Sequence, residues 1–218
     1  MLDNKKILDA KHITIVTTDA SFANASALYT YILTLHKKVS IVSDEEINIK
    51  YSFLPWFDKV RKKQPVSSDL ILIVDDDVKY MYSFLSDFKI NKKMSLSLYA
   101  ALCIKYRFFT SDNCDGTEFA LANELVVYGA DIKLVKKNIY ESLSLSYIRL
   151  KSFMYQNMIL KNNATVANLY VDDDLFKSSG AIMKDAEAVM FEILRMSVVK
   201  KVFLIQDNKI IKTLKKEI

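Results

Sequence analysis

Short apolar segments alternate with helix-spaced ones in the first third of the chain. Residues 12–17 (HITIVT) and 38–43 (KVSIVS) are apolar and β-branched, as strands are, and the apolar spacing of residues 25–35 between them favours a helix. Residues 54–56 (LPW) mark a turn into a short helix. Residues 69–74 (DLILIV) form a continuous apolar run, typical of a central parallel strand buried on both faces. This order predicts a doubly wound parallel sheet.

The middle of the chain has the apolar spacing of helices. The predicted helices cover residues 80–88, 95–108, 117–128, 132–139 and 141–159. Asp115 or Thr117 can cap the third of these helices, and Gly129 stands where a helix C-terminal glycine belongs. A long run of helices after a parallel sheet is consistent with an α/β domain.

Beyond residue 160 the pattern returns to the period of strands. Strands are predicted at residues 164–171, 198–206 and 209–214, around a helix at residues 182–196. We therefore expect two domains: an α/β domain at residues 1–158, which includes the long connecting helix, and a small α+β domain at residues 159–218.

Composition indicates a folded globular chain. Hydrophobic residues make up 51% and charged residues 26% of the 218 positions. The net charge of +5 comes from scattered basic pairs, which more often cover solvated faces than form a nucleic-acid track. No segment approaches the ~20 apolar residues that cross a bilayer, and residues 1–10 lack the apolar core of a secretory signal. The expected location is cytoplasmic, without a membrane partner.

Few residues in the chain are suited to phosphate or metal chemistry. It has 3 glycines and 2 histidines, although phosphate-binding loops use glycine and divalent-metal hydrolases recruit imidazole. Cys103 and Cys114 form no CxxC pair and are interpreted as ordinary thiols. This composition argues against a catalyst.

Three consecutive carboxylates follow the predicted strand at residues 69–74. Asp75, Asp76 and Asp77 could hold one oxygen-ligated cation, because ligands of α/β sheets gather at the carboxyl ends of strands. The alternative is a solvated turn that caps the next helix. That alternative is favoured, since Asp prefers helix N-termini.

Residues 99–142 carry a resemblance to a known family. The segment RFFTSDN is followed by a helix ending in GAD and then by NIYES. The residues at these places are Arg107, Phe108, Ser111, Gly129, Ala130, Asp131, Asn138, Tyr140, Glu141 and Ser142. In this the chain resembles the DHH/DHHA1 phosphoesterases, which include RecJ-like exonucleases, nanoRNases and cyclic-dinucleotide phosphodiesterases. The resemblance implies a DHH-like doubly wound domain followed by a reduced, truncated DHHA1-like domain.

The resemblance also implies two divalent metals held by carboxylates and imidazoles, which activate a water and stabilise charge on the phosphoryl group. In the first motif, within residues 16–26, the expected ligand positions hold Val16, Ala20 and Phe22. Asp19 is the one carboxylate there, and it is out of register. An apolar side chain such as Phe22 cannot ligate a cation.

The later motifs are depleted as well. Asp75 matches the aspartate of the second motif. No histidine lies between residues 78 and 98, where the DHH triplet belongs. In the fourth motif, Ile104 occupies the ligand position and Tyr106 replaces a glycine. The glycine-rich, histidine-containing loop of the DHHA1 domain is absent before Ile218, and whether that absence is natural stays open.

These observations predict a catalytically inactive DHH-phosphoesterase-like protein with no catalytic residue and no cofactor, which acts by binding, foremost to another protein. One alternative is a Mn²⁺-dependent phosphodiesterase of short oligonucleotides or (cyclic) dinucleotides. Its metal ligands would be Asp19, Asp75, Asp76 and Asp77. A second alternative is non-hydrolytic binding of a nucleotide or single-stranded nucleic acid, with Arg107 as phosphate contact. The oligomeric state is open.

Overall fold

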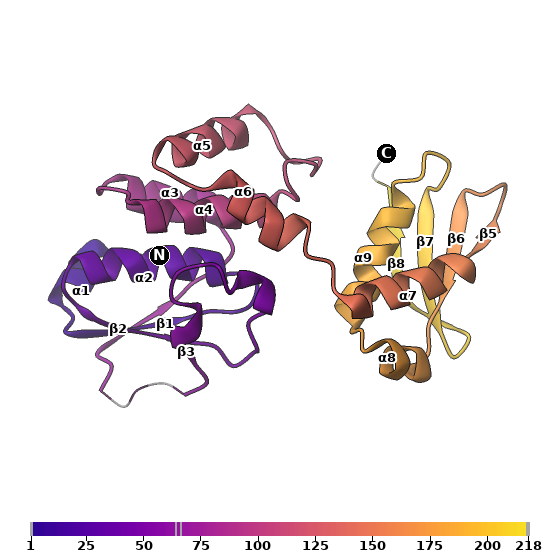
Figure 1. Ribbon diagram of the computed structural model, residues 1–218, viewed down its shortest axis with the longest axis horizontal. Helices are drawn as coiled ribbons and strands as arrows, with labels where there is room; N and C mark the ends of the chain where they lie inside the picture. The colour runs from indigo at the N-terminus through magenta and orange to yellow at the C-terminus, as the bar shows by residue number, and fades with distance from the viewer. Residues whose placement is uncertain (1, 64, 66, 217–218) are drawn as a thin grey trace. The chain divides into compact units, whose positions relative to one another are not determined.

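The computed structural model describes residues 2–63, 65 and 67–216. The chain divides into two compact units, Met1–Ser142 and Leu143–Ile218, each with its own hydrophobic core (Figure 1). Within the described ranges, no helix has the length and apolar character needed to cross a membrane.

A four-stranded parallel sheet forms the base of the first unit. Its strands are β1 (His12–Val16), β2 (Lys38–Val42), β3 (Val60–Arg61) and β4 (Leu70–Ile73), in the order β3-β2-β1-β4. Ile13 stands opposite Val39 on one side and Leu70 on the other. The α/β class and the parallel sheet predicted from the sequence are therefore confirmed.

The prediction that residues 69–74 form a central strand was wrong. β4 lies at the edge of the sheet, and burial alternates along it: Ile71 is 50% and Ile73 81% exposed, whereas Leu70 and Leu72 pack against the core. Successive side chains of a strand point to opposite faces of the sheet, and the helices of this unit lie over one face, so Ile71 and Ile73 lack the cover that Leu70 and Leu72 have.

The helices of the first unit lie in layers over one face of this sheet (Figure 1). They are α1 (Asn4–Asp9), α2 (Phe22–Thr34), α3 (Val78–Ser86), α4 (Lys92–Lys105), α5 (Gly116–Val127) and α6 (Ile132–Val135), with short turns η1 (Ile49–Tyr51), η2 (Phe57–Lys59) and η3 (Lys136–Tyr140). In α2, every residue from 22 to 32 is buried, because the sheet covers one side and α4 the other. Its lack of charged residues follows from that position. Gly129 follows α5 with φ of 100°, as its predicted C-terminal role requires.

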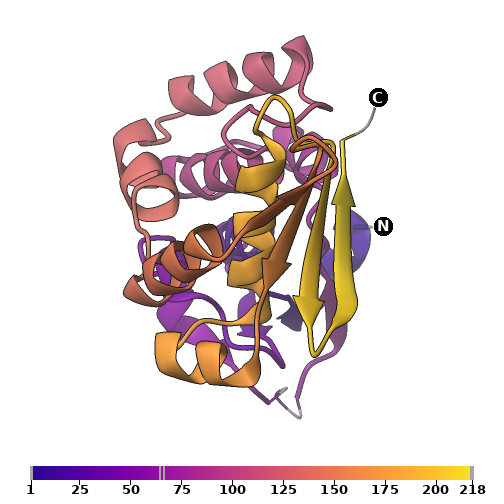
Figure 2. The same cartoon turned by 90° about the vertical axis from the view of Figure 1, so that its right-hand side faces the viewer.

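The second unit is a mixed sheet packed on helices. Its elements are α7 (Leu145–Gln156), β5 (Ile159–Lys161), β6 (Val166–Tyr170), α8 (Asp173–Ser179), α9 (Met183–Leu194), β7 (Lys201–Gln206) and β8 (Lys209–Lys215). The strand order is β5-β6-β7-β8, with β6 and β7 parallel and the other pairs antiparallel. Asp207 and Asn208, both with positive φ, make the two-residue turn between β7 and β8. In Figure 2 the strands lie in front of α9.

The boundary between the units falls earlier than the sequence pattern suggests. The long predicted helix at residues 141–159 begins only at Leu145, behind the N-cap Ser144, and the units divide at 142/143 rather than after residue 158. Tyr147, Leu150 and Met154 of α7 are buried in the core of the second unit. Helix period alone cannot tell which core an amphipathic face will join.

Candidate functional site at the carboxyl edge of the parallel sheet

The order of the strands marks one place for a ligand in the first unit. The chain runs from β1 to β2 and β3 in one direction, and β4 then joins β1 on the opposite side. Open α/β sheets bind ligands beyond the carboxyl ends of strands at such a switch point. Here the switch point lies beyond Val16 and Ile73, which are register partners. The segments that border it are residues 17–21 and 74–77.

Hydroxyl groups shape the loop after β1. Ser21 Oγ lies 2.9 Å from Thr17 Oγ1 and accepts a hydrogen bond from the backbone N–H of Thr18 at 3.0 Å. Thr18 Oγ1 in turn accepts from the N–H of Ser21 at 3.4 Å. These contacts close the turn that starts α2, and they occupy the hydroxyl groups with one another.

Asp19, the one carboxylate of this loop, has a structural partner. It is 8% exposed, and its Oδ1 accepts a hydrogen bond from the backbone N–H of Asn48 at 2.8 Å. Burial, together with the negative charge of Asp19, raises the pKa of Tyr51. Asp19 therefore ties residues 17–21 to the loop after β2.

The acidic triplet is exposed, and its members hold the turn into α3. Asp75 Oδ1 accepts the N–H of Asp77 at 3.1 Å, and the Asp75 carbonyl accepts from Asn24 Nδ2 at 3.0 Å. Asp77 Oδ1 accepts the N–H of Tyr80 at 3.0 Å and so caps α3. The structure thus shows Asp77 in the helix-capping role that the sequence offered as one of two interpretations.

Asp76 pairs with a lysine of α4. The distance from Asp76 Oδ2 to Lys105 Nζ is 2.6 Å, and both side chains are partly exposed. The ammonium group neutralises part of the negative charge that would attract a cation. Among the residues that the structure describes, no three His, Cys, Asp or Glu side chains form a group that could hold a metal ion. The carboxylates among these residues do not fit a two-metal centre.

Aromatic rings fill the motif position at the start of α2. Phe22 has no exposed surface, and its ring centroid lies 5.9 Å from those of Tyr51 and Phe57. Such spacing is typical of packed aromatic pairs. The N-terminal end of α2 is therefore closed by hydrocarbon on this side.

Arg107 lies in a left-handed turn after α4. Arg107, Phe108 and Phe109 have φ values of 48°, 54° and 63°, a conformation that costs L-residues energy. The turn is held by the N–H of Phe108, which donates to the Cys103 carbonyl at 2.7 Å, and by Thr110 Oγ1, which donates to the Arg107 carbonyl at 2.7 Å. Arg107 is exposed. Its role as a phosphate contact stays a prediction.

The sequence did not single out the buried carboxylate of Glu118. It is the N3 residue of a capping box: its Oε2 accepts the N–H of the N-cap Asp115 at 2.7 Å. Lys79 forms an ion pair with Glu118 and donates to Thr117 Oγ1 at 2.9 Å. The pKa of Glu118 is lowered to about 2, chiefly by the hydrogen bond from the Lys79 ammonium group and secondly by that from the Asp115 N–H. The D-x-x-E spacing at the helix start was the available sequence signal.

Neither thiol is activated as a nucleophile. Burial raises the pKa of Cys103 to about 12. Loss of water and the nearby carboxylates Glu118 and Asp115 raise the pKa of Cys114. Reactive cysteines need a lowered pKa, so both behave as ordinary thiols, as predicted.

One hollow lies beside the candidate site, beyond the ends of β2 and β3. Its volume is about 300 Å³, and its walls include Glu45, Glu46, Arg61 and Lys62. Ser43 Oγ, which lines it, has no hydrogen-bond partner among the described residues. Charges of both signs face the hollow, so it offers no consistently positive field for a phosphate group.

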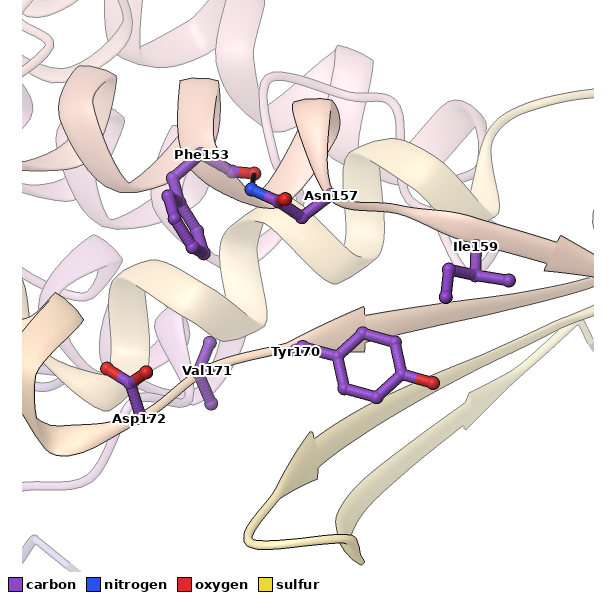
Figure 3. Close-up of a pocket in the computed structure, with 6 residues that line it drawn as sticks. All are labelled: Phe153, Asn157, Ile159, Tyr170, Val171 and Asp172. Atoms are coloured by element: carbon purple, nitrogen blue, oxygen red, sulfur yellow. Dashed lines mark hydrogen bonds between the residues drawn. The ribbon is translucent and has the colours of Figure 1, made fainter.

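The second unit has a hollow of about 360 Å³ beside β5 and β6 (Figure 3). It is lined by Phe153, Asn157, Ile159, Tyr170, Val171 and Asp172. Asn157 Nδ2 donates to the Phe153 carbonyl at 2.9 Å, and Asp172 caps α8. Its lining includes no basic side chain, which disfavours phosphate here as well.

No protein-family model matches the chain, and no curated protein matches it in sequence. Among solved structures, an exopolyphosphatase-related protein from Bacteroides fragilis is similar at 12% identity with a TM-score of 0.76, covering 94% of this chain and 78% of that one. A candidate family II inorganic pyrophosphatase from Methanococcus jannaschii aligns at 10% identity over 78% of this chain and 57% of that one, with a TM-score of 0.29, too low to support an argument. The first likeness shows that this chain shares the fold of that protein, and the DHH/DHHA1 assignment stays a prediction.

Proposed function

We propose that this protein is a non-hydrolysing relative of the DHH phosphoesterases that acts by binding another protein. The observation that carries the proposal is the use of the acidic side chains at the switch point. Asp19 binds a backbone N–H, Asp76 pairs with Lys105, and Asp77 caps α3. Each of these three carboxylates binds a group of the protein itself, whereas the carboxylates of a metal-dependent hydrolase bind a metal ion.

The physical requirement of the family reaction supports the same conclusion. Two cations close together repel each other and need several anionic or imidazole ligands around them. Phe22 offers a buried ring at the position where the resemblance expects a ligand, and Tyr106 stands where the family has a glycine. A cation placed there would lose its water without gaining a donor, which is costly.

A binding role is consistent with the exposed apolar surface of both units. Ile73 and Val127 in the first unit, and Ile182 and Ile210 in the second, are each more than half exposed. Exposed apolar side chains contribute to protein interaction surfaces where they gather into a patch. The scattered basic residues of the first unit do not form the continuous track that a nucleic acid needs.

The test is a turnover assay with Mn²⁺. Purified protein is incubated with a linear dinucleotide and with a nucleoside 3′,5′-bisphosphate, and the products are separated by chromatography. We expect both substrates to stay intact. Turnover that Asp75→Ala abolishes and Asp112→Ala preserves would overturn the proposal, because Asp112 is an exposed carboxylate outside the candidate site.

A further inference from the structure

One face of the second sheet, opposite α9, carries side chains in three cross-strand rows. The register places in one row Lys161, Val166, Lys201 and Lys215, in the next Ile159, Asn168, Phe203 and Thr213, and in the third Tyr170, Ile205 and Ile210. We call these eleven residues the open sheet face. Ala167, Val202 and Leu204 point to the other face and are fully buried in the core. Figure 2 views the strands from the side away from α9.

The lysine row is unfavourable for the isolated sheet. Lys201 and Lys215 stand directly opposite each other on neighbouring strands, and like charges in that position destabilise a sheet. Lys161 lies in the same row, beyond Val166. Lys201 Nζ is 5.6 Å from the ring centroid of Phe203, so its charge lies over the aromatic ring in the second row. An acidic ligand would offset the repulsion along this row.

Asn168 is a second unfavourable feature in the middle of the same face. Its side chain is 7% exposed, and its Oδ1 has no hydrogen-bond partner among the described residues. Ile159 and Phe203 flank it in the second row and offer no polar group from their side chains. A buried acceptor without a partner is rare and calls for an explanation. That oxygen has almost no surface open to solvent, so a donor from a bound molecule reaches it when the flanking side chains of Ile159 and Phe203 move aside.

The second unit as a whole is positively charged, as the lysine row is. Residues 143–218 contain 12 Lys and Arg and 8 Asp and Glu, a net charge of +4 out of the chain's +5. The excess of positive charge therefore belongs to the smaller unit. An acidic molecule is attracted to this unit before it makes contact.

We propose that the open sheet face binds an acidic and apolar segment of a protein partner in extended conformation. The proposal rests on the proposed function and names the surface and the chemistry of the partner. Neighbouring strands are about 4.8 Å apart, so the row from Lys161 to Lys215 spans roughly 14 Å, the length of four to five extended residues. Carboxylates of the segment pair with the lysine row, and its apolar side chains cover Ile159, Phe203 and Ile210.

The arrangement of the face favours a peptide over a single-stranded nucleic acid. Positive charge is confined to one row, whereas a nucleic acid needs a basic track along its whole backbone. The remaining two rows hold aromatic rings only at Phe203 and Tyr170, which stand in different rows among aliphatic and polar side chains and do not form a continuous set of stacking rings. Phe203 is only partly exposed and lies under Lys201.

The test is a selection of random 12-residue peptides displayed on phage against the full chain. We expect the enriched peptides to combine two or more acidic residues with alternating apolar ones. Binding of the best peptide, measured by fluorescence anisotropy, should weaken about tenfold in Lys161→Glu/Lys201→Glu and fall with added salt. Lys177→Glu is the matched control, because its ion pair with Asp174 lies on α8 and is highly exposed.

Asn168→Val separates a binding role from a structural one. The variant removes the unpaired acceptor, so it should raise the melting temperature and at the same time weaken peptide binding.

Three outcomes would each overturn the inference. They are enriched peptides without acidic residues, binding that survives the double lysine variant, and tighter binding of a 12-residue oligouridylate than of the best peptide. Turnover in the Mn²⁺ assay would instead overturn the proposed function, so the two failures are distinguishable.

Discussion

Glu118 and Lys79 form an ion pair in which the carboxylate is fully buried and the ammonium group stays 47% exposed. The same carboxylate accepts the N–H of Asp115 and closes the capping box of α5. A single side chain therefore fixes the start of α5 against α3.

This pair predicts a pH dependence of stability. The pKa of Glu118 is lowered from its ordinary value of 4.5 to about 2, so its contribution is complete above about pH 4.5 and is lost as the pH falls towards 2. Glu118→Gln keeps the length and a capping oxygen but removes the charge. In urea unfolding, the variant should be less stable than the wild type at pH 7, and the difference should shrink between pH 4.5 and 2. A difference that stays constant over that range would contradict the role of the charge.

We expect truncation of Phe22 to lower the free energy of unfolding strongly. Phe22→Ala removes a fully buried ring that touches Tyr51 and Phe57, and such truncations cost about 3–5 kcal/mol of the free energy of unfolding. Chemical denaturation measures the loss. Phe119→Ala is the control, because Phe119 stacks on Phe109 but is 56% exposed. Equal losses in both variants would show that the ring of Phe22 is not central to the core.

The left-handed turn at Arg107 predicts a difference between two small substitutions. Arg107→Ala removes the long side chain but leaves an L-residue at the unfavourable φ of 48°. Arg107→Gly removes the side chain too, and glycine adopts this φ without the steric cost. The glycine variant should be more stable than the alanine variant by about 1 kcal/mol, which is the relief expected for one left-handed residue. Equilibrium urea unfolding of the two proteins gives this difference directly. An alanine variant as stable as the glycine variant would show that the turn is unstrained at this position.

The lysine pair on the second sheet predicts a stabilising charge reversal. Lys215→Glu converts a like-charge pair with Lys201 into an opposite-charge pair and should add about 0.2–1 kcal/mol to the free energy of unfolding. High salt should abolish the gain, because both groups face solvent. Thermal melts at low and high ionic strength measure it. Lys209→Glu, at the exposed end of β8 opposite Gln206, is the control and should change little.

The sequence was a good guide to which segments form elements. The β-branched runs at residues 12–17 and 38–43 became β1 and β2, because side chains of that kind fit a pleated surface in any sheet. Asp115 capped α5, and Gly129 ended that helix, because both signals act within one turn of the backbone. Local chemistry of this kind depends little on the rest of the chain.

The sequence was a poorer guide to what lies beside an element. β4 looked like a central strand and lies at the edge, since its neighbours depend on strand order, which hydrophobicity does not encode. The helix α7 was assigned to the wrong domain for the same reason, because its apolar face joins the core of the second unit. The partners of Asp19 and Asp76 lie 29 residues away in each case, beyond the reach of any spacing pattern.

The amino-acid sequence by itself determined the α/β class and the scarcity of glycine and histidine, because residue chemistry and periodicity are properties of the chain alone. Only the tertiary structure decided that the remaining carboxylates serve the fold, and that Lys161, Lys201 and Lys215 share one row. Those relationships arise from strand register, which brings together residues from three separate strands. Register is set by the packing of the whole unit and not by any one segment.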